Sequence, residues 1–164
     1  MKTLKSLTLL AVSFAGLLSC QSGPTKEEIK ASAEEQLLVN KQLDSVYRIL
    51  DDAYQSYHPA TMDAALEGLK VYLNNAQSKM QQIKPLSQNQ KLTGAIEEKI
   101  AVMKSVAQNE AIEQVRIYKL PDSVFTEDLI KKWNDLDTSV KQKLSQASQN
   151  VESAYNEIQN ELKK

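Results

Sequence analysis

The chain has 164 residues and a nearly balanced charge, with 20 lysines and arginines against 21 aspartates and glutamates and a formal net charge of −1 at pH 7. This balance excludes the basic footprint with which nucleic-acid-binding proteins neutralise phosphates, so no nucleic-acid partner is expected. A single cysteine and a single histidine exclude an intrachain disulfide framework and a zinc site built from several such ligands.

The first 19 residues predict a signal peptide. Lys2 and Lys5 give a positive start, and a largely apolar run follows over residues 7–18. This run of roughly a dozen residues suits a secretory h-region and falls short of the ~20 residues that span a membrane. The one cysteine, Cys20, follows the run after a single serine. An ordinary secretory peptide that happens to contain a cysteine is the alternative.

The stretch Leu17-Leu18-Ser19-Cys20 resembles the lipobox of bacterial lipoproteins, in which the cysteine is acylated and becomes the mature N-terminus. The resemblance implies removal of residues 1–19, a lipid on Cys20 and a membrane partner reached through that lipid. Gln21 follows the cysteine, and by resemblance to lipoprotein sorting in two-membrane bacteria this favours the outer membrane, facing the periplasm. The cell surface is the alternative.

The remaining chain predicts four amphipathic helices separated by prolines. Residues 20–25 form a short tether, and the folded domain is expected over 26–164. Capping boxes are predicted at Thr25–Glu28 and at 87–90. The helices are expected over 26–56, 61–83, 87–118 and from 126 onward.

Apolar residues recur in each segment at alternating three- and four-residue steps, and no segment alternates with the period of a strand. Short connections force neighbouring helices to run antiparallel, so the sequence predicts an all-α, up-down-up-down four-helix bundle. Gln36 and Asn40 interrupt the first apolar stripe, and polar groups at such positions can specify a register or a partner. An elongated coiled-coil assembly that completes its core by homo-oligomerising is therefore the alternative.

No catalytic residue, metal site or cofactor is predicted, and an enzyme is not expected. His58 is the only histidine, and it lies in a predicted turn before Pro59. Asp51 and Asp52 are adjacent and point roughly 100° apart on a helix, which prevents both from binding one ion well. Phosphate-binding glycine loops and nucleophile elbows are also absent from the sequence.

Two predicted connections carry residues that could contact a partner protein. Tyr54, Tyr57 and His58 cluster where the first helix ends, and Phe125 precedes the last helix. In an upright bundle the short tether places both connections far from the membrane. The alternatives are that the tyrosines complete the core, that His58 faces water, and that Phe125 forms a hydrophobic staple at Thr126.

Beyond the lipobox, the domain resembles the small all-helical lipoproteins of Gram-negative bacteria that have no known function. The resemblance implies a membrane-anchored, non-catalytic interaction or structural module of the cell envelope, with an unknown envelope protein as its partner. A bundle lipoprotein that binds an apolar or carbohydrate-like small ligand is the alternative. An enlarged cavity near Tyr47, Tyr54 or Trp133 would favour it.

Cys20→Ala should abolish lipidation and leave the precursor uncleaved, because the thiol is the acylated atom in a lipobox. The measurement is incorporation of radiolabelled fatty acid, together with the gel mobility of the chain in membranes. Ser22→Ala, two residues beyond, serves as the matched control and should label normally. Equal labelling of wild type and Cys20→Ala would contradict the lipobox interpretation.

Overall fold

The structure is a computed structural model that describes residues 23–83 and 86–164. The predicted signal peptide and Cys20 lie outside the described residues. The described part folds into α-helices and two short 3₁₀ turns, without a strand, which confirms the all-α prediction. The elements are α1 (Lys26–Gln55), α2 (Pro59–Gln82), η1 (Ser87–Asn89), α3 (Gln90–Gln108), α4 (Glu110–Tyr118), η2 (Asp122–Val124) and α5 (Glu127–Leu162).

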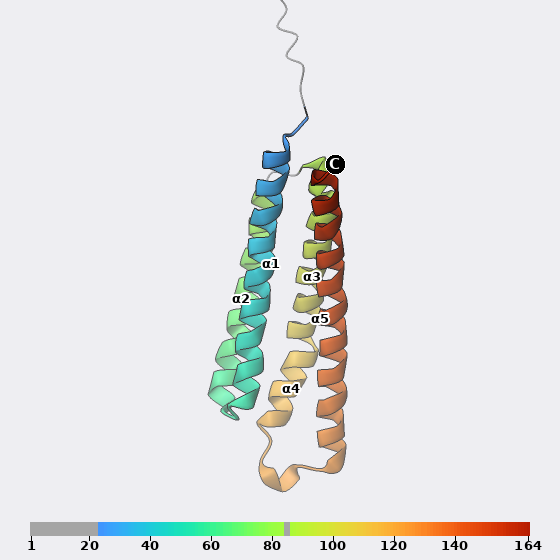
Figure 1. Ribbon diagram of the computed structural model, residues 1–164. Helices are drawn as coiled ribbons and strands as arrows, with labels where there is room; N and C mark the ends of the chain where they lie inside the picture. Colours follow the sequence, from blue (N-terminus) through green and yellow to red (C-terminus); the bar gives the residue numbers. More distant parts are fainter. Residues whose placement is uncertain (1–22, 84–85) are drawn as a thin grey trace, which may run out of the picture.

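The helices form an up-down-up-down bundle in which α3 and α4 together make the third arm (Figure 1). Helix α1 packs against α2, α2 against α3, and α3 against α5. The start of α1 and the end of α5 meet at one end, where Lys26 Nζ donates a hydrogen bond of 2.9 Å to the carbonyl of Leu162. Among the described residues, no helix has the length and apolar character needed to cross a membrane.

Two of the predicted helix starts are confirmed at atomic detail. The backbone N–H of Glu28 donates to Thr25 Oγ1 at 3.1 Å, and the N–H of Thr25 donates to Glu28 Oε2 at 2.8 Å, which is a complete capping box. At the start of α5, Thr126 Oγ1 accepts from the N–H of Leu129 at 3.3 Å. Each cap satisfies a backbone donor that has no partner within its own helix.

The predicted capping box at 87–90 is wrong. Ser87 begins the turn η1, and its hydroxyl donates to Gln88 Oε1 at 2.9 Å. The N-cap of α3 is Asn89, whose buried side chain donates to the carbonyl of Ile29 at 3.0 Å. The side chain at the actual N-cap thus makes a tertiary contact with α1 and does not cap α3.

The predicted third helix is also interrupted, at Asn109, where φ is −121° and ψ is −80°. The Asn109 side chain donates to the carbonyl of Ser105 at 2.8 Å, and its backbone N–H donates to the same oxygen at 3.0 Å. Asparagine offers the backbone this kind of local partner and so weakens a helix interior. The single helix expected over 87–118 is consequently two helices that meet at one residue.

The core follows the predicted stripes for most of the bundle. Every apolar residue of the predicted α2 stripe is buried, and Leu69 at its middle is 0% exposed. Leu129, Trp133 and Leu136 lie partly exposed near the start of α5, and the buried residues of the α5 stripe begin at Val140. The buried α2 stripe consists of Met62, Leu66, Leu69, Leu73, Ala76, Met80 and Ile83.

Leu69→Asp should unfold the bundle or destabilise it by more than about 4 kcal/mol, because it places an unpaired carboxylate at a fully buried position. Thermal unfolding followed by far-ultraviolet circular dichroism measures the effect. Val71→Asp on the same helix is the control: Val71 is 60% exposed, so this change should stay within ~0.5 kcal/mol. Equal melting temperatures for Leu69→Asp and wild type would contradict the assigned core.

Candidate functional site

Both predicted contact connections lie at the same end of the bundle, opposite the start of α1 (Figure 1). This end, called the distal end below, contains the turn 56–58 between α1 and α2 and the link 119–126 between α4 and α5. The two connections come from opposite halves of the chain and are brought together because the four arms run antiparallel.

Four aromatic rings form a cluster at the distal end, called the aromatic cluster below: Tyr54, Tyr57, Tyr118 and Trp133. Tyr118 of α4 lies at its centre. Its ring stacks on Tyr54 at 5.8 Å and 12°, and meets Tyr57 and Trp133 edge-on at 5.8 and 5.5 Å. Tyr54 also meets Trp133 edge-on at 6.3 Å. Such pairs contribute ~0.5–1.5 kcal/mol each, so the cluster joins α1, α4 and α5.

Tyr54 belongs to the core side of this cluster. It is 5% exposed, and its hydroxyl donates to the carbonyl of Ala111 at 3.4 Å. Burial, with a smaller contribution from Tyr47, raises the pKa of Tyr54, so the hydroxyl stays protonated. Trp133 Nε1 is buried beside it and has no hydrogen-bond partner among the described residues. Both side chains therefore act mainly through packing.

Tyr57 forms the exposed side of the cluster. It is 75% exposed, and among the described residues it is the one non-glycine with a positive φ, 53°. A left-handed conformation costs a residue with a Cβ about 1–2 kcal/mol. The turn tolerates this cost because Pro59 opens α2 immediately afterwards and the Tyr57 ring packs against Tyr118. The sequence pattern indicated Tyr57 as a contact residue, but it gave no sign of the strained backbone.

His58 and Phe125 complete the set of predicted contact residues. His58 is exposed and occupies the N-cap of α2, although its side chain caps none of the described backbone donors. Phe125 is 39% exposed, next to Val124 at 45%. No ring contact within the described part joins Phe125 to the aromatic cluster. Tyr57 and Phe125 are thus both exposed at one end, and Phe125 is not part of the aromatic cluster.

Ion pairs surround the aromatic cluster and hold α4 in place. Glu113 accepts hydrogen bonds from Arg116 at 2.6 and 2.8 Å and from Lys132 of α5 at 2.5 Å. These bonds lower the pKa of Glu113 to about 2, so its carboxylate stays charged in mild acid. Lys119 reaches Asp63 of α2 at 2.5 Å. Helix α4 is therefore tied to both neighbouring arms next to Tyr118.

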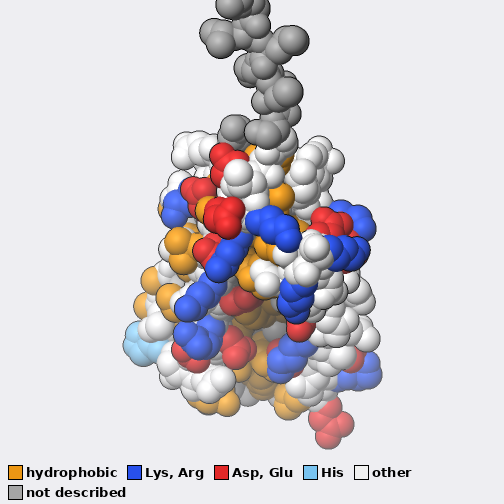
Figure 2. Space-filling model, turned by 45° about the horizontal axis from the view of Figure 1, so that its top comes forward, with side chains coloured by type: hydrophobic (Ala, Val, Ile, Leu, Met, Phe, Trp, Pro, Cys, Tyr) orange, Lys and Arg blue, Asp and Glu red, His pale blue; other side chains and the backbone are white. Residues whose placement is uncertain are grey.

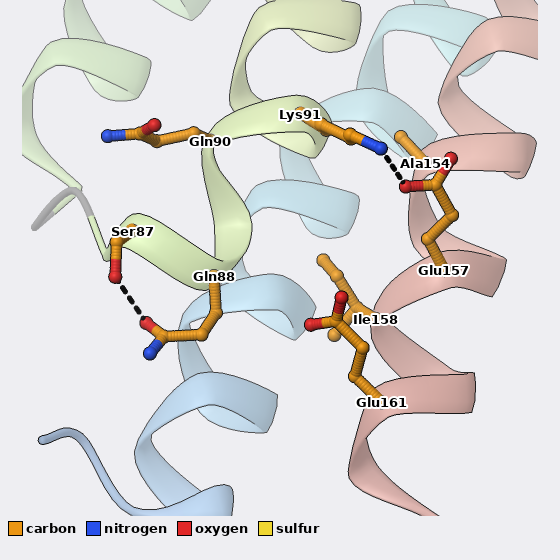
Figure 3. A pocket seen from close by; sticks show the side chains of 8 residues that line it. All are labelled: Ser87, Gln88, Gln90, Lys91, Ala154, Glu157, Ile158 and Glu161. Carbon is orange, nitrogen blue, oxygen red and sulfur yellow. Dashed lines mark hydrogen bonds and ion pairs between the residues drawn. The ribbon is translucent and has the colours of Figure 1, made fainter.

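A polar cleft of about 360 Å³ lies at the opposite end, between η1 with the start of α3 and the end of α5. Figure 3 shows Lys91 reaching across it to Glu157, at 2.5 Å. The two side chains are 74% and 49% exposed, and such hydrated pairs contribute little. Within the described residues no cluster of three His, Cys, Asp or Glu side chains could hold a metal.

The chain matches no protein-family model, and comparison with curated proteins and with solved structures gives no significant match. A functional assignment must therefore rest on the chain's own residues. Of these, the sequence pattern located Tyr54 and Trp133 on their helices and Tyr57 at the end of the first helix, but it did not identify Tyr118 as their common centre. Tyr118 lies on α4, which follows the break at Asn109, and no local sequence pattern indicates which residues it contacts.

Tyr57→Gly should be more stable than Tyr57→Ala by about 1 kcal/mol. Both changes remove the ring, and only alanine keeps a Cβ in the left-handed conformation. Urea unfolding of the full chain measures the difference. Ser56, at φ −73°, is the matched control, where alanine should instead be the more stable of the two. Greater stability of Tyr57→Ala would show that the strained turn is assigned wrongly.

Proposed function

We propose that this chain is a membrane-anchored lipoprotein that acts as a non-catalytic interaction module of the cell envelope, contacting a partner protein through its distal end. The observation that carries the proposal is Tyr57, an exposed aromatic residue held in a strained backbone conformation. Strain of this kind persists where the surroundings impose it, and it concentrates at functional sites.

The proposed anchor and the proposed contact lie at opposite ends of the bundle. Helix α1 has 30 residues, which at 1.5 Å per residue extends about 45 Å. With a lipid on Cys20 and a tether of a few residues, the distal end would stand that far from the membrane surface. Lys163 and Lys164 follow the end of α5 at the anchored end, where cations favour anionic headgroups.

The distal surface has the composition of a small protein interface. Tyr57, Val124 and Phe125 present exposed apolar area, and the ion pair of Asp63 with Lys119 adds charged groups at the same end of the bundle. Tyrosine supplies a large contact area at a low cost in side-chain entropy, and the contact of Tyr57 with Tyr118 reduces that cost further. An envelope protein facing the periplasm suits this surface; for a chain at the cell surface the partner would be external.

Lateral association is the competing arrangement. The outer face of α1 and α2 carries an apolar groove lined by Val46, Ile49, Gly68 and Val71, among others, and Ile49 and Val71 are 56% and 60% exposed. A homo-oligomer would bury this face rather than the distal end. Probes placed at the two surfaces therefore separate the two arrangements.

The test places a photocrosslinking amino acid at position 57, 125 or 49 of the acylated full-length chain in its native membrane. We expect the same partner band from positions 57 and 125 and none from position 49. Combined Tyr57→Ala and Phe125→Ala should lower capture about tenfold without loss of helicity, since a contact residue contributes ~1–2 kcal/mol. Leu38→Ala, another exposed apolar residue, is the matched control. Crosslinks from position 49 alone would replace the distal contact with lateral association.

A further inference from the structure

A groove runs along the face of the bundle on which α1 and α5 flank α3 (Figure 1). Its volume is about 220 Å³, and residues of all three helices line it. Lys99 and Met103 of α3 form the floor, and Asp44 and Tyr47 belong to the α1 wall. Figure 2 shows the same side of the molecule from higher up, with charged side chains around a hollow that exposes hydrophobic atoms.

Lys99 is the unusual residue of this groove, because its side chain is only 1% exposed. Its ammonium donates to Asn40 Oδ1 at 2.9 Å and to Asp44 Oδ1 at 2.6 Å. An ammonium has three N–H donors, and the third has no partner among the described residues. A buried donor without an acceptor is costly, and an oxygen atom supplied by a ligand would satisfy it.

Three hydroxyl groups on the walls of the groove also have no hydrogen-bond partner among the described residues: Tyr47, Ser145 and Ser148. The serines are three residues apart on α5 and so share one face of that helix. Burial, then the nearby Asp51 and Asp137, raises the pKa of Tyr47, which keeps its hydroxyl a neutral donor. The groove thus offers donors and acceptors on both walls.

Both lysines of the groove are paired with carboxylates. Lys99 is paired with Asp44, and Lys141 donates to Asp137 at 2.8 Å. Asp51 lies close enough to influence both Lys141 and Tyr47, so there is no net positive charge to attract an anion. Met103 and Leu144 add apolar surface beside the hydroxyl groups. A neutral ligand with several hydroxyl groups and C–H faces matches this combination.

We propose that the groove between α1 and α5 binds a neutral polyhydroxy molecule of monosaccharide size. The third N–H of Lys99 donates a hydrogen bond to a ligand hydroxyl oxygen. Other hydroxyl groups of the ligand form hydrogen bonds with Tyr47, Ser145 and Ser148. The C–H face of the ligand packs on Met103 and Leu144. The ligand is either a free sugar or one residue of a glycan chain. This site is separate from the distal end and does not depend on the partner proposed there.

The test uses the full-length acylated chain with ¹³C-labelled methionine methyl groups, in a detergent without sugar groups. All three methionines of the described residues are buried, but only Met103 lines the groove, so Met62 and Met80 serve as internal references. D-glucose, maltotriose and inorganic phosphate are titrated separately. We expect a sugar to shift the Met103 signal and leave the references unchanged. Tighter binding of glucose identifies a free sugar as the source, and tighter binding of maltotriose identifies a glycan chain.

Ser145→Ala combined with Ser148→Ala should weaken sugar binding about tenfold, the effect of ~1.4 kcal/mol of lost hydrogen bonding. Ser153→Ala, an exposed serine of α5 outside the groove, is the matched control and should bind as wild type does. These variants avoid the buried Lys99, whose replacement could unfold the chain. A Met103 signal that responds only to phosphate, or to neither sugar up to about 100 mM, overturns the proposal, as does unchanged binding by the double serine variant.

Discussion

Burial of the α2 stripe is the constraint on which the rest of the bundle depends. All of its apolar residues from Met62 to Ile83 are buried, and they extend over the whole length of the helix. A single helix cannot remove such a stripe from water, so α1 and α3 must pack along it on either side. The short turn 56–58 makes α1 run antiparallel to α2. Helix α5 then covers the remaining face of α3 and completes the fourth arm.

A buried polar residue, Lys99, lies between α1 and α5. Lys99 occupies the face of α3 that a close contact between α1 and α5 would cover, and its pairing with Asn40 and Asp44 satisfies the ammonium from the α1 side. A buried charge of this kind is stable only with partners in good geometry. The Lys99–Asp44 ion pair therefore lies at the groove between α1 and α5.

The distal end departs from the regular bundle for a different reason. Aromatic rings join the aliphatic side chains in the packing here, and Tyr118 contacts the other three aromatic residues of the cluster. The bend at Asn109 and the bonds of Glu113 to Arg116 and Lys132 set the position of α4 that makes this contact possible. Tyr57 therefore remains exposed to solvent while its ring packs against Tyr118.

The sequence alone determined the four arms, their antiparallel order and most of their buried faces, because helix periodicity, proline and the caps at Thr25 and Thr126 are local properties of the chain. It also placed Tyr57 and Phe125 at one end, since connection length sets direction. The break at Asn109 is also local, because its side chain donates to the carbonyl of Ser105 four residues earlier, although the apolar stripe does not reveal it. Only the tertiary structure decided that the Asn89 side chain donates to the carbonyl of Ile29 and that Tyr118 centres the aromatic cluster. The buried Lys99 belongs with these, because its partners are more than fifty residues away in the chain. Each of these features depends on which side chains meet across helices, and a periodic pattern contains no information about that.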